Sequence, residues 1–122
     1  MTPAPERTGE ERADRTTIAP AVLVSIARQT ALAVPGVAGL APVPGGVNRW
    51  FRRGLGDGVR IAVEGGRARV DLYLVFGRDS NVRQVGRAVQ TDVARAFQEM
   101  VGMPVDGVNV HIEDIDFSSP VP

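Results

Sequence analysis

Residues 70–117 read VDLYLVFGRDSNVRQVGRAVQTDVARAFQEMVGMPVDGVNVHIEDIDF. The stretch begins with the two-residue alternation of a half-buried strand. Asn81 is placed to cap a helix, with Gln84 three residues later as in a capping box, and Gly102 is placed to end that helix. A last strand is predicted over residues 105–117. The stretch therefore predicts a strand, a helix and a strand, and one face of the first strand is apolar: Ala68, Val70, Leu72, Leu74 and Phe76.

The residues before this stretch add a partner strand. Val59, Ile61 and Val63 alternate with polar or small residues, and Gly65-Gly66 separates them from the strand that follows. Two glycines suit a two-residue hairpin turn because they tolerate positive φ angles. A β-hairpin is therefore expected.

An opening helix and a short strand precede the hairpin. Pro20 suits the first turn of a helix over residues 20–34, and Pro35-Gly36 ends it. Apolar residues lie on several sides of this helix, so it is expected to be largely covered. A strand over residues 37–40 and a long loop over residues 41–57 follow.

Two predictions concern the chain's last helix and last strand. The apolar side of the helix is expected to include Val85, Phe97 and Met100. In the last strand the alternating apolar residues are expected to be buried: Val108, Val110 and Ile112. Ile115 and Phe117 break this alternation and predict a bulge or an exit from the sheet.

These elements predict an α/β (α+β) fold in two layers. A small, mostly antiparallel sheet of about four strands carries both helices on one face. Residues 17–117 form a single domain, which 122 residues in total allow. Residues 1–16 are polar and predict a disordered N-terminal tail, and residues 118–122 a C-terminal tail.

Composition excludes several classes of chemistry. The chain has no cysteine and no lysine, so thiol nucleophiles, zinc–thiolate sites and lysine Schiff bases are absent. Its formal net charge of zero argues against a domain-wide attraction to nucleic acid or anionic lipid. No apolar run approaches the roughly 20 residues of a membrane span, and no secretory signal is recognisable. A cytoplasmic location is expected.

The pattern of motifs resembles the alkaline shock and general (envelope) stress response protein family. The shared motifs are Pro35-Gly36-Val37, Phe76-Gly77, Gln90 with Val93, Met100-Val101-Gly102 and Val108-Asn109-Val110. The resemblance implies a two-layer fold without known catalytic activity, and no cofactor. It also implies a homo-oligomer that gathers at the inner face of the cell membrane through a membrane-anchored protein partner.

The outward face of the hairpin's second strand is the first candidate surface. Arg69, Asp71, Tyr73 and Val75 alternate with its core residues. Tyr73 and Val75 are expected to form an exposed patch for a partner or a second copy. Scattered exposure without a binding role is the competing interpretation.

The long loop contains the second candidate, Arg49, Trp50, Phe51, Arg52 and Arg53. Arginines with two aromatics could contact lipid phosphates, stack on bases or bind a protein. The competing interpretation is that the aromatics fold back onto the core while the arginines stay solvated.

Catalytic and metal sites are not expected. His111 and Glu113 occupy alternate strand positions, yet a stable metal site needs three or four converging ligands. The single histidine would also have to serve any nucleophilic triad.

The predicted function is a non-enzymatic stress-response scaffold, and the alternatives are a small RNA-binding module or a direct peripheral membrane binder.

Overall fold

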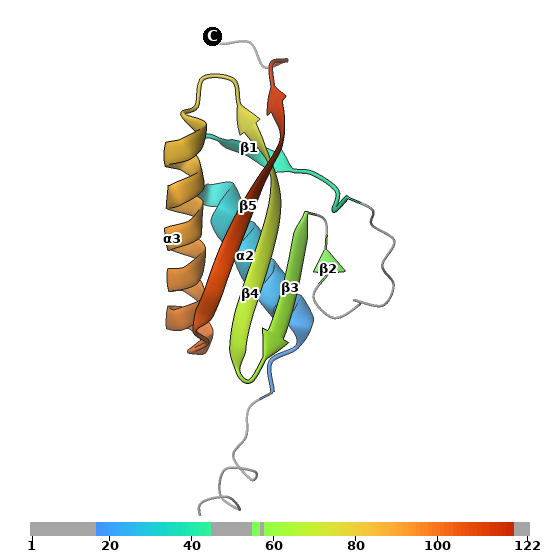
Figure 1. Ribbon diagram of the computed structural model, residues 1–122, viewed down its shortest axis with the longest axis vertical. Coiled ribbons are helices and arrows are strands. Elements are labelled where there is room, and N and C mark those ends of the chain that lie inside the picture. The colour runs from blue at the N-terminus through green and yellow to red at the C-terminus, as the bar shows by residue number, and fades with distance from the viewer. Residues whose placement is uncertain (1–16, 45–54, 57, 119–122) are drawn as a thin grey trace, which may run out of the picture.

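The computed structural model describes residues 17–44, 55–56 and 58–118 of the chain. The elements in order are α2 (Pro20–Ala33), β1 (Val37–Leu40), β2 (Leu55–Gly56), β3 (Val59–Glu64), β4 (Arg67–Gly77), α3 (Val82–Val101) and β5 (Val105–Asp116). Figure 1 shows α2 crossing behind the sheet and α3 running alongside β5. The predicted two-layer α+β fold is confirmed.

Both helices begin and end where the sequence predicts. Pro20 lies in the first turn of α2, which ends just before Pro35. The side chain of Asn81 accepts a hydrogen bond from the backbone N–H of Gln84 at 3.1 Å and so caps α3. Gly102 ends α3 in the left-handed conformation with φ 66°, which a residue without Cβ adopts without strain.

β4 is the central strand, and it pairs along both of its edges. β3 pairs with it antiparallel through the turn at Gly65-Gly66, whose φ angles are 60° and 77°. β1 pairs antiparallel farther along the same edge, from Val37 opposite Phe76. The two-residue strand β2 pairs with the start of β3, and it lies inside the segment expected to be a loop.

β5 is parallel to β4 and occupies the other edge of β4. A parallel strand needs a long crossover connection, which α3 provides. The register shifts twice along this pair. Leu74 lies opposite Ile112 but Val75 lies opposite Asp114, so Glu113 is an extra residue on β5. The predicted irregularity near the end of the strand is therefore confirmed as a bulge.

One hydrophobic core lies between the sheet and the helices. Its fully buried members come from both layers, with Leu72, Leu74 and Phe76 from β4 and Val89, Val93 and Phe97 from α3. Since β4 is paired on both edges and covered by helices on one face, its inward side chains are fully buried.

The predicted burial fails at two positions, Met100 in the last turn of α3 and Ile112 on β5, both of which are exposed. The expectation that the first helix is largely covered also fails in part, because Val22 and Leu32 on α2 are exposed. Periodicity reports the direction of a side chain but not whether another element extends far enough to cover it. Ile112 shows the difference most clearly: it lies opposite the fully buried Leu74, yet on an edge strand it is 54% exposed.

Candidate protein-contact face

The outer face of the sheet, which neither helix covers, is the candidate site. Arg69, Asp71, Tyr73 and Val75 alternate along β4 with the core residues and so lie on this face. Arg60 of β3, together with Asn109 and His111 of β5, lies beside them in register. These seven residues are called the outer-face set below.

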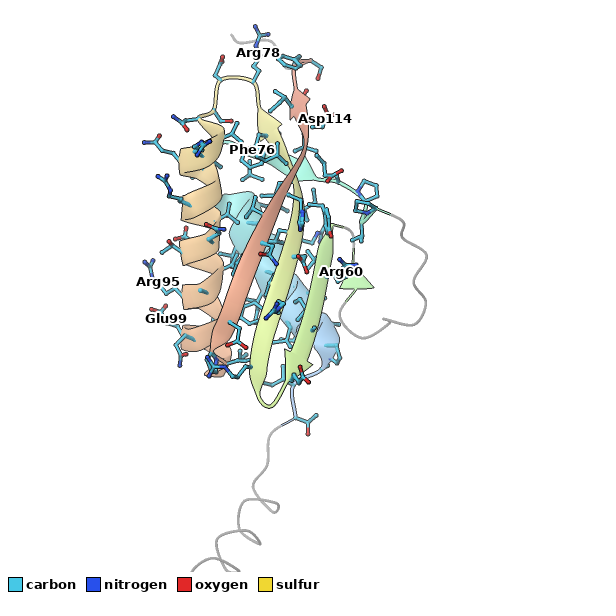
Figure 2. All side chains as sticks on the ribbon, viewed as in Figure 1. Arg60, Phe76, Arg78, Arg95, Glu99 and Asp114 are labelled. Atoms are coloured by element: carbon cyan, nitrogen blue, oxygen red, sulfur yellow. The ribbon has the colours of Figure 1, made fainter. Side chains whose placement is uncertain are left out.

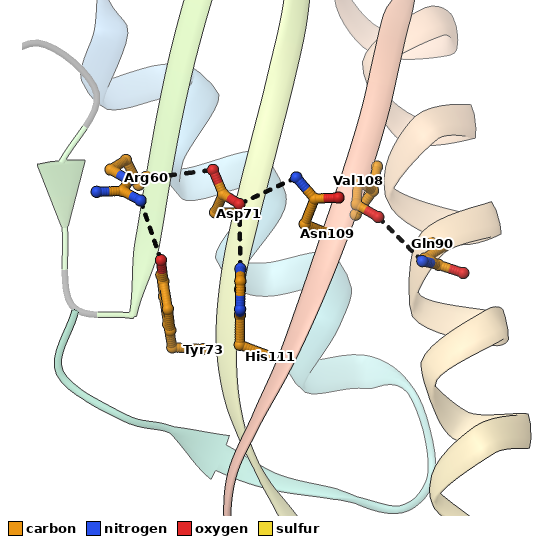
Figure 3. Close-up of polar contacts among 7 residues, drawn as sticks. All are labelled: Arg60, Asp71, Tyr73, Gln90, Val108, Asn109 and His111. Atoms are coloured by element: carbon orange, nitrogen blue, oxygen red, sulfur yellow. Dashed lines mark hydrogen bonds and ion pairs between the residues drawn. The ribbon is translucent and has the colours of Figure 1, made fainter. Parts of the chain in front are cut away.

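Asp71 connects side chains from three strands (Figure 3). Its Oδ1 accepts hydrogen bonds from Asn109 Nδ2 and His111 Nε2, each at 3.1 Å. Its Oδ2 lies 3.9 Å from Nε of Arg60. The Asp71 side chain is only 19% exposed, whereas the side chains of Arg60 and His111 are 36% and 39% exposed. The carboxylate is therefore more shielded from water than its partners, and its charge-assisted contacts tie the three strands together.

Tyr73 and His111 form a stacked pair next to Asp71. Their ring centroids are 4.3 Å apart and their planes differ by 9°. The hydroxyl of Tyr73 accepts a hydrogen bond from a guanidinium nitrogen of Arg60 at 3.1 Å. The pair and its two polar neighbours therefore make one continuous layer over the middle of β4.

The prediction that Tyr73 is exposed is wrong. Tyr73 does lie on the outer face, but it is only 6% exposed. The cause is its place on the central strand, because His111 from β5 and Arg60 from β3 close over the ring from both sides. An exposed Tyr73–Val75 patch is therefore absent, and Arg69 is the exposed member of the predicted four.

Three members of the outer-face set were not predicted from the sequence: Arg60, Asn109 and His111. Alternation on each strand does place them opposite the core, so a directional signal was present. The sequence does not show the register between strands, because Asp71 and His111 are 40 residues apart in the chain. Only the parallel pairing of β5 with β4 brings them together.

His111 and Glu113 do not form the metal pair considered from the sequence. His111 hydrogen-bonds Asp71, and Glu113 is the extra residue of the bulge. Within residues 17–44, 55–56 and 58–118, no group of three or more His, Cys, Asp or Glu side chains is placed to hold a metal ion. The second candidate surface, Arg49 to Arg53, lies outside the described residues.

The buried polar groups of the outer face are satisfied. Every buried side-chain nitrogen or oxygen in the described part of the chain has a hydrogen-bond partner. Side chains that are already held by such contacts lose little further conformational entropy when a surface is covered. None of the helices described is both long enough and apolar enough to cross a lipid bilayer.

Comparison with known proteins gives matches over most of the chain. The sequence profile of the alkaline shock protein family, described as having a cell envelope-related function, matches residues 8–117. Uncharacterized protein YloU of Bacillus subtilis (strain 168) is 24% identical over 103 residues, which cover 81% of this chain and 86% of YloU. Uncharacterized protein YqhY of the same organism is 28% identical over 104 residues, covering 84% and 77%.

Solved structures of similar fold include those of the MamM CTD. A zinc form superposes with a TM-score of 0.52 at 16% sequence identity, covering 83% of this chain and 91% of that one. A doubly substituted MamM CTD gives the same TM-score and identity and covers 83% and 88%. At this identity the likeness concerns the fold alone.

Proposed function

The chain belongs to the alkaline shock protein family, which has a cell envelope-related function, and from this premise we propose that the protein is a non-enzymatic stress-response scaffold. It associates with copies of itself and docks on a membrane-anchored protein partner at the cytoplasmic face of the cell envelope. The outer-face set is the docking surface, and no cofactor takes part.

The observation that carries this proposal is the free outer face of the sheet. Both helices pack on the opposite face, so a third layer from a partner has access to the outer one (Figure 1). Arg69 is exposed on this face between two small residues, Ala62 opposite on β3 and Gly107 opposite on β5. Its guanidinium is therefore accessible to a carboxylate or a backbone carbonyl of a partner.

The contacts of His111 favour a binding role over catalysis. In nucleophilic enzymes the imidazole contacts both an orienting carboxylate and the hydroxyl or thiol that it activates. Here His111 has the carboxylate of Asp71, but no hydroxyl group hydrogen-bonds its ring among the described residues. The pair instead holds Tyr73 in place.

The RNA-binding alternative loses the support that the sheet could give it. On the sheet it required an aromatic ring with a free face for a base. Tyr73 is the aromatic residue at that position, and its ring is stacked on His111 and nearly fully covered.

Co-sedimentation with membranes tests the docking. We expect the wild type to pellet with membranes isolated from cells that express it, and to stay in the supernatant once those membranes have been stripped with protease. Arg69→Glu should weaken the binding about tenfold, equivalent to about 1.4 kcal/mol. Arg28→Glu on α2 makes the same charge change on another exposed surface and should bind normally.

Two results would contradict this proposal. Equal binding to protein-free anionic vesicles would replace the protein partner with direct lipid contact. Equal binding of Arg69→Glu and the wild type would remove the outer face as the docking surface.

A further inference from the structure

A second surface lies where β5 ends and α3 begins. In Figure 1 the second half of β5 and the first turns of α3 lie at the same end of the molecule, and the end of β4 lies between them in this view. Ile112 on this part of β5 is 54% exposed, although the residue opposite it on β4 is fully buried. Any contact that removes this large apolar side chain from water is favourable.

Before and after Ile112 along β5, side chains hydrogen-bond backbone groups at the free edge of the strand. The carbonyl of Val108 points away from β4, because it accepts a hydrogen bond from Gln90 Nε2 of α3 at 3.0 Å. The backbone N–H of Ile115 donates to Asp114 Oδ1 at 2.8 Å. Side chains thus cover two backbone groups that an edge strand would otherwise leave free. The open stretch between them contains Ile112.

Acidic side chains gather on β5 at this stretch. Glu113, Asp114 and Asp116 lie within four residues, and none of them makes an ion pair within the described residues. Hydrogen bonds from the side chain and the backbone of Ser118 lower the pKa of Asp116 below its ordinary value of 3.8. Asp116 therefore stays ionised at neutral and mildly acidic pH.

Arginines gather on the flank of α3 that faces Val108 and Val110 of β5. Gly86 lies close to Val110, and Gln90 bonds Val108, so this flank of the helix faces β5. Arg83 precedes Gly86 by three residues and Arg87 precedes Gln90 by three, which places both arginines along that flank. Both are exposed, and neither makes an ion pair with any described residue. Arg83 also lies in the first turn of α3, where the helix dipole disfavours positive charge.

We propose that this α3–β5 edge is the contact between two copies of the chain. The inference rests on the self-association in the proposed function and identifies the surface that carries it. In a twofold dimer each copy presents the same patch to the other, so a patch with one basic and one acidic half is complementary to itself. The arginines of α3 in one copy face the acids of β5 in the other, and the two Ile112 side chains are covered near the axis.

The charge of the whole chain is compatible with this arrangement. Its formal net charge is zero, so two copies approach without net repulsion. The local separation of charge then supplies the orientation, because wrong pairings bring like charges together. Figure 2 shows Asp114 on the upper part of β5 and Arg78 in the turn above it, at this same end of the molecule.

Charge reversal tests the edge. The α3 variant carries Arg83→Glu and Arg87→Glu, and the β5 variant carries Glu113→Arg and Asp116→Arg. Light scattering over a concentration series should give the wild type a mass that rises to twice that of the monomer. Each variant alone should remain monomeric at concentrations where the wild type is dimeric. A 1:1 mixture of the two variants should regain the dimer. In the mixed dimer the acidic α3 and acidic β5 of one variant face the basic β5 and basic α3 of the other, so both contacts join opposite charges.

The mixture separates a lost contact from a damaged fold, because a misfolded variant would not be rescued. A control with Arg28→Glu and Arg95→Glu changes the net charge as the α3 variant does. Arg28 is exposed on α2, and Arg95 lies about two turns beyond Arg87 on α3, where it makes only an exposed ion pair with Asp92 at 3.7 Å. It should dimerise like the wild type.

Four outcomes would overturn the inference. Normal dimers from both variants would move self-association elsewhere and leave the proposed function standing. Monomeric variants without rescue on mixing would exclude the pairing of arginines with acids. A wild type that stays monomeric at every concentration would exclude self-association. The docking part of the proposed function would still stand or fall on the separate test with Arg69→Glu. Monomeric wild type with membrane binding that needs Arg83 and Arg87 would assign the edge to another partner.

Discussion

Asp71 is the residue on which the outer face depends. It accepts hydrogen bonds from Asn109 and His111 and pairs with Arg60, so a single carboxylate contacts β3 and β5 from the strand between them. Arg60 in turn bonds Tyr73, whose ring His111 covers. Because the groups share partners, the removal of one leaves several others unsatisfied.

Substitution of Asp71 with alanine should therefore lower the free energy of unfolding by about 1–3 kcal/mol, because it removes at once the charged acceptor of two hydrogen bonds and the ion-pair partner of Arg60. The matched control is Asp106→Ala, which removes the exposed ion pair between Arg67 and Asp106 at 2.6 Å. Exposed pairs contribute about 0–1 kcal/mol. Urea unfolding of both variants checks the difference, and equal losses would show that the Asp71 contacts stabilise no more than a surface pair.

At the scale of elements, the connection between α2 and β1 is packed closely against the start of α3. Gly36 lies in this connection with φ 104°, a conformation that side chains other than glycine's rarely adopt. A Cβ atom there would lie 2.6 Å from Cγ2 of Val85 and 3.1 Å from Cβ of Ser80. The start of α3 therefore packs directly on the turn that follows α2.

Gly36→Ala should destabilise the fold by about 1–3 kcal/mol through backbone strain, with a further loss from the displacement of Val85. Gly39→Ala, three residues later in β1, is the control because a Cβ there meets nothing within 4 Å. Its stability should change by no more than about 0.5 kcal/mol. Thermal unfolding of the two variants measures the contrast, and a Gly36→Ala protein as stable as the control would mean that α3 and the turn are not in tight contact.

At the scale of the whole molecule, one core joins the sheet to both helices and leaves the outer face and the α3–β5 edge uncovered by either helix. Phe97, fully buried on α3, is among the largest side chains of that core. The helix that it anchors also holds the arginines of the proposed dimer edge, whereas the outer face lies across the sheet. The proposed docking and the proposed self-association therefore use different surfaces and can be tested one at a time without disturbing the core.

Phe97→Ala should lower the free energy of unfolding by about 3–5 kcal/mol, the usual range for removal of a buried aromatic ring. Met100→Ala on the same helix is the control, because that side chain is 67% exposed and its loss should change stability by less than about 0.5 kcal/mol. Denaturant titration of both proteins tests this. Similar small effects would mean that α3 adds little to the core.

Local patterning was enough to predict most elements of this protein. Pro20 and Pro35 bound the first helix, Asn81 and Gly102 bound the second, and Gly65-Gly66 marks the hairpin turn. These features depend on backbone conformation and on neighbours a few residues away, so the sequence alone reports them. The resemblance to the alkaline shock protein family is confirmed by the profile match as well.

The candidate surfaces depended on contacts between distant segments. The parallel pairing of β5 with β4 brings His111 to Asp71 and covers Tyr73, which alternation alone had placed in solvent. The same pairing leaves Ile112 on an open edge, although its period predicted burial. Periodicity gives a side chain its direction, but burial and partners depend on which strand lies alongside, and only the tertiary structure decides that.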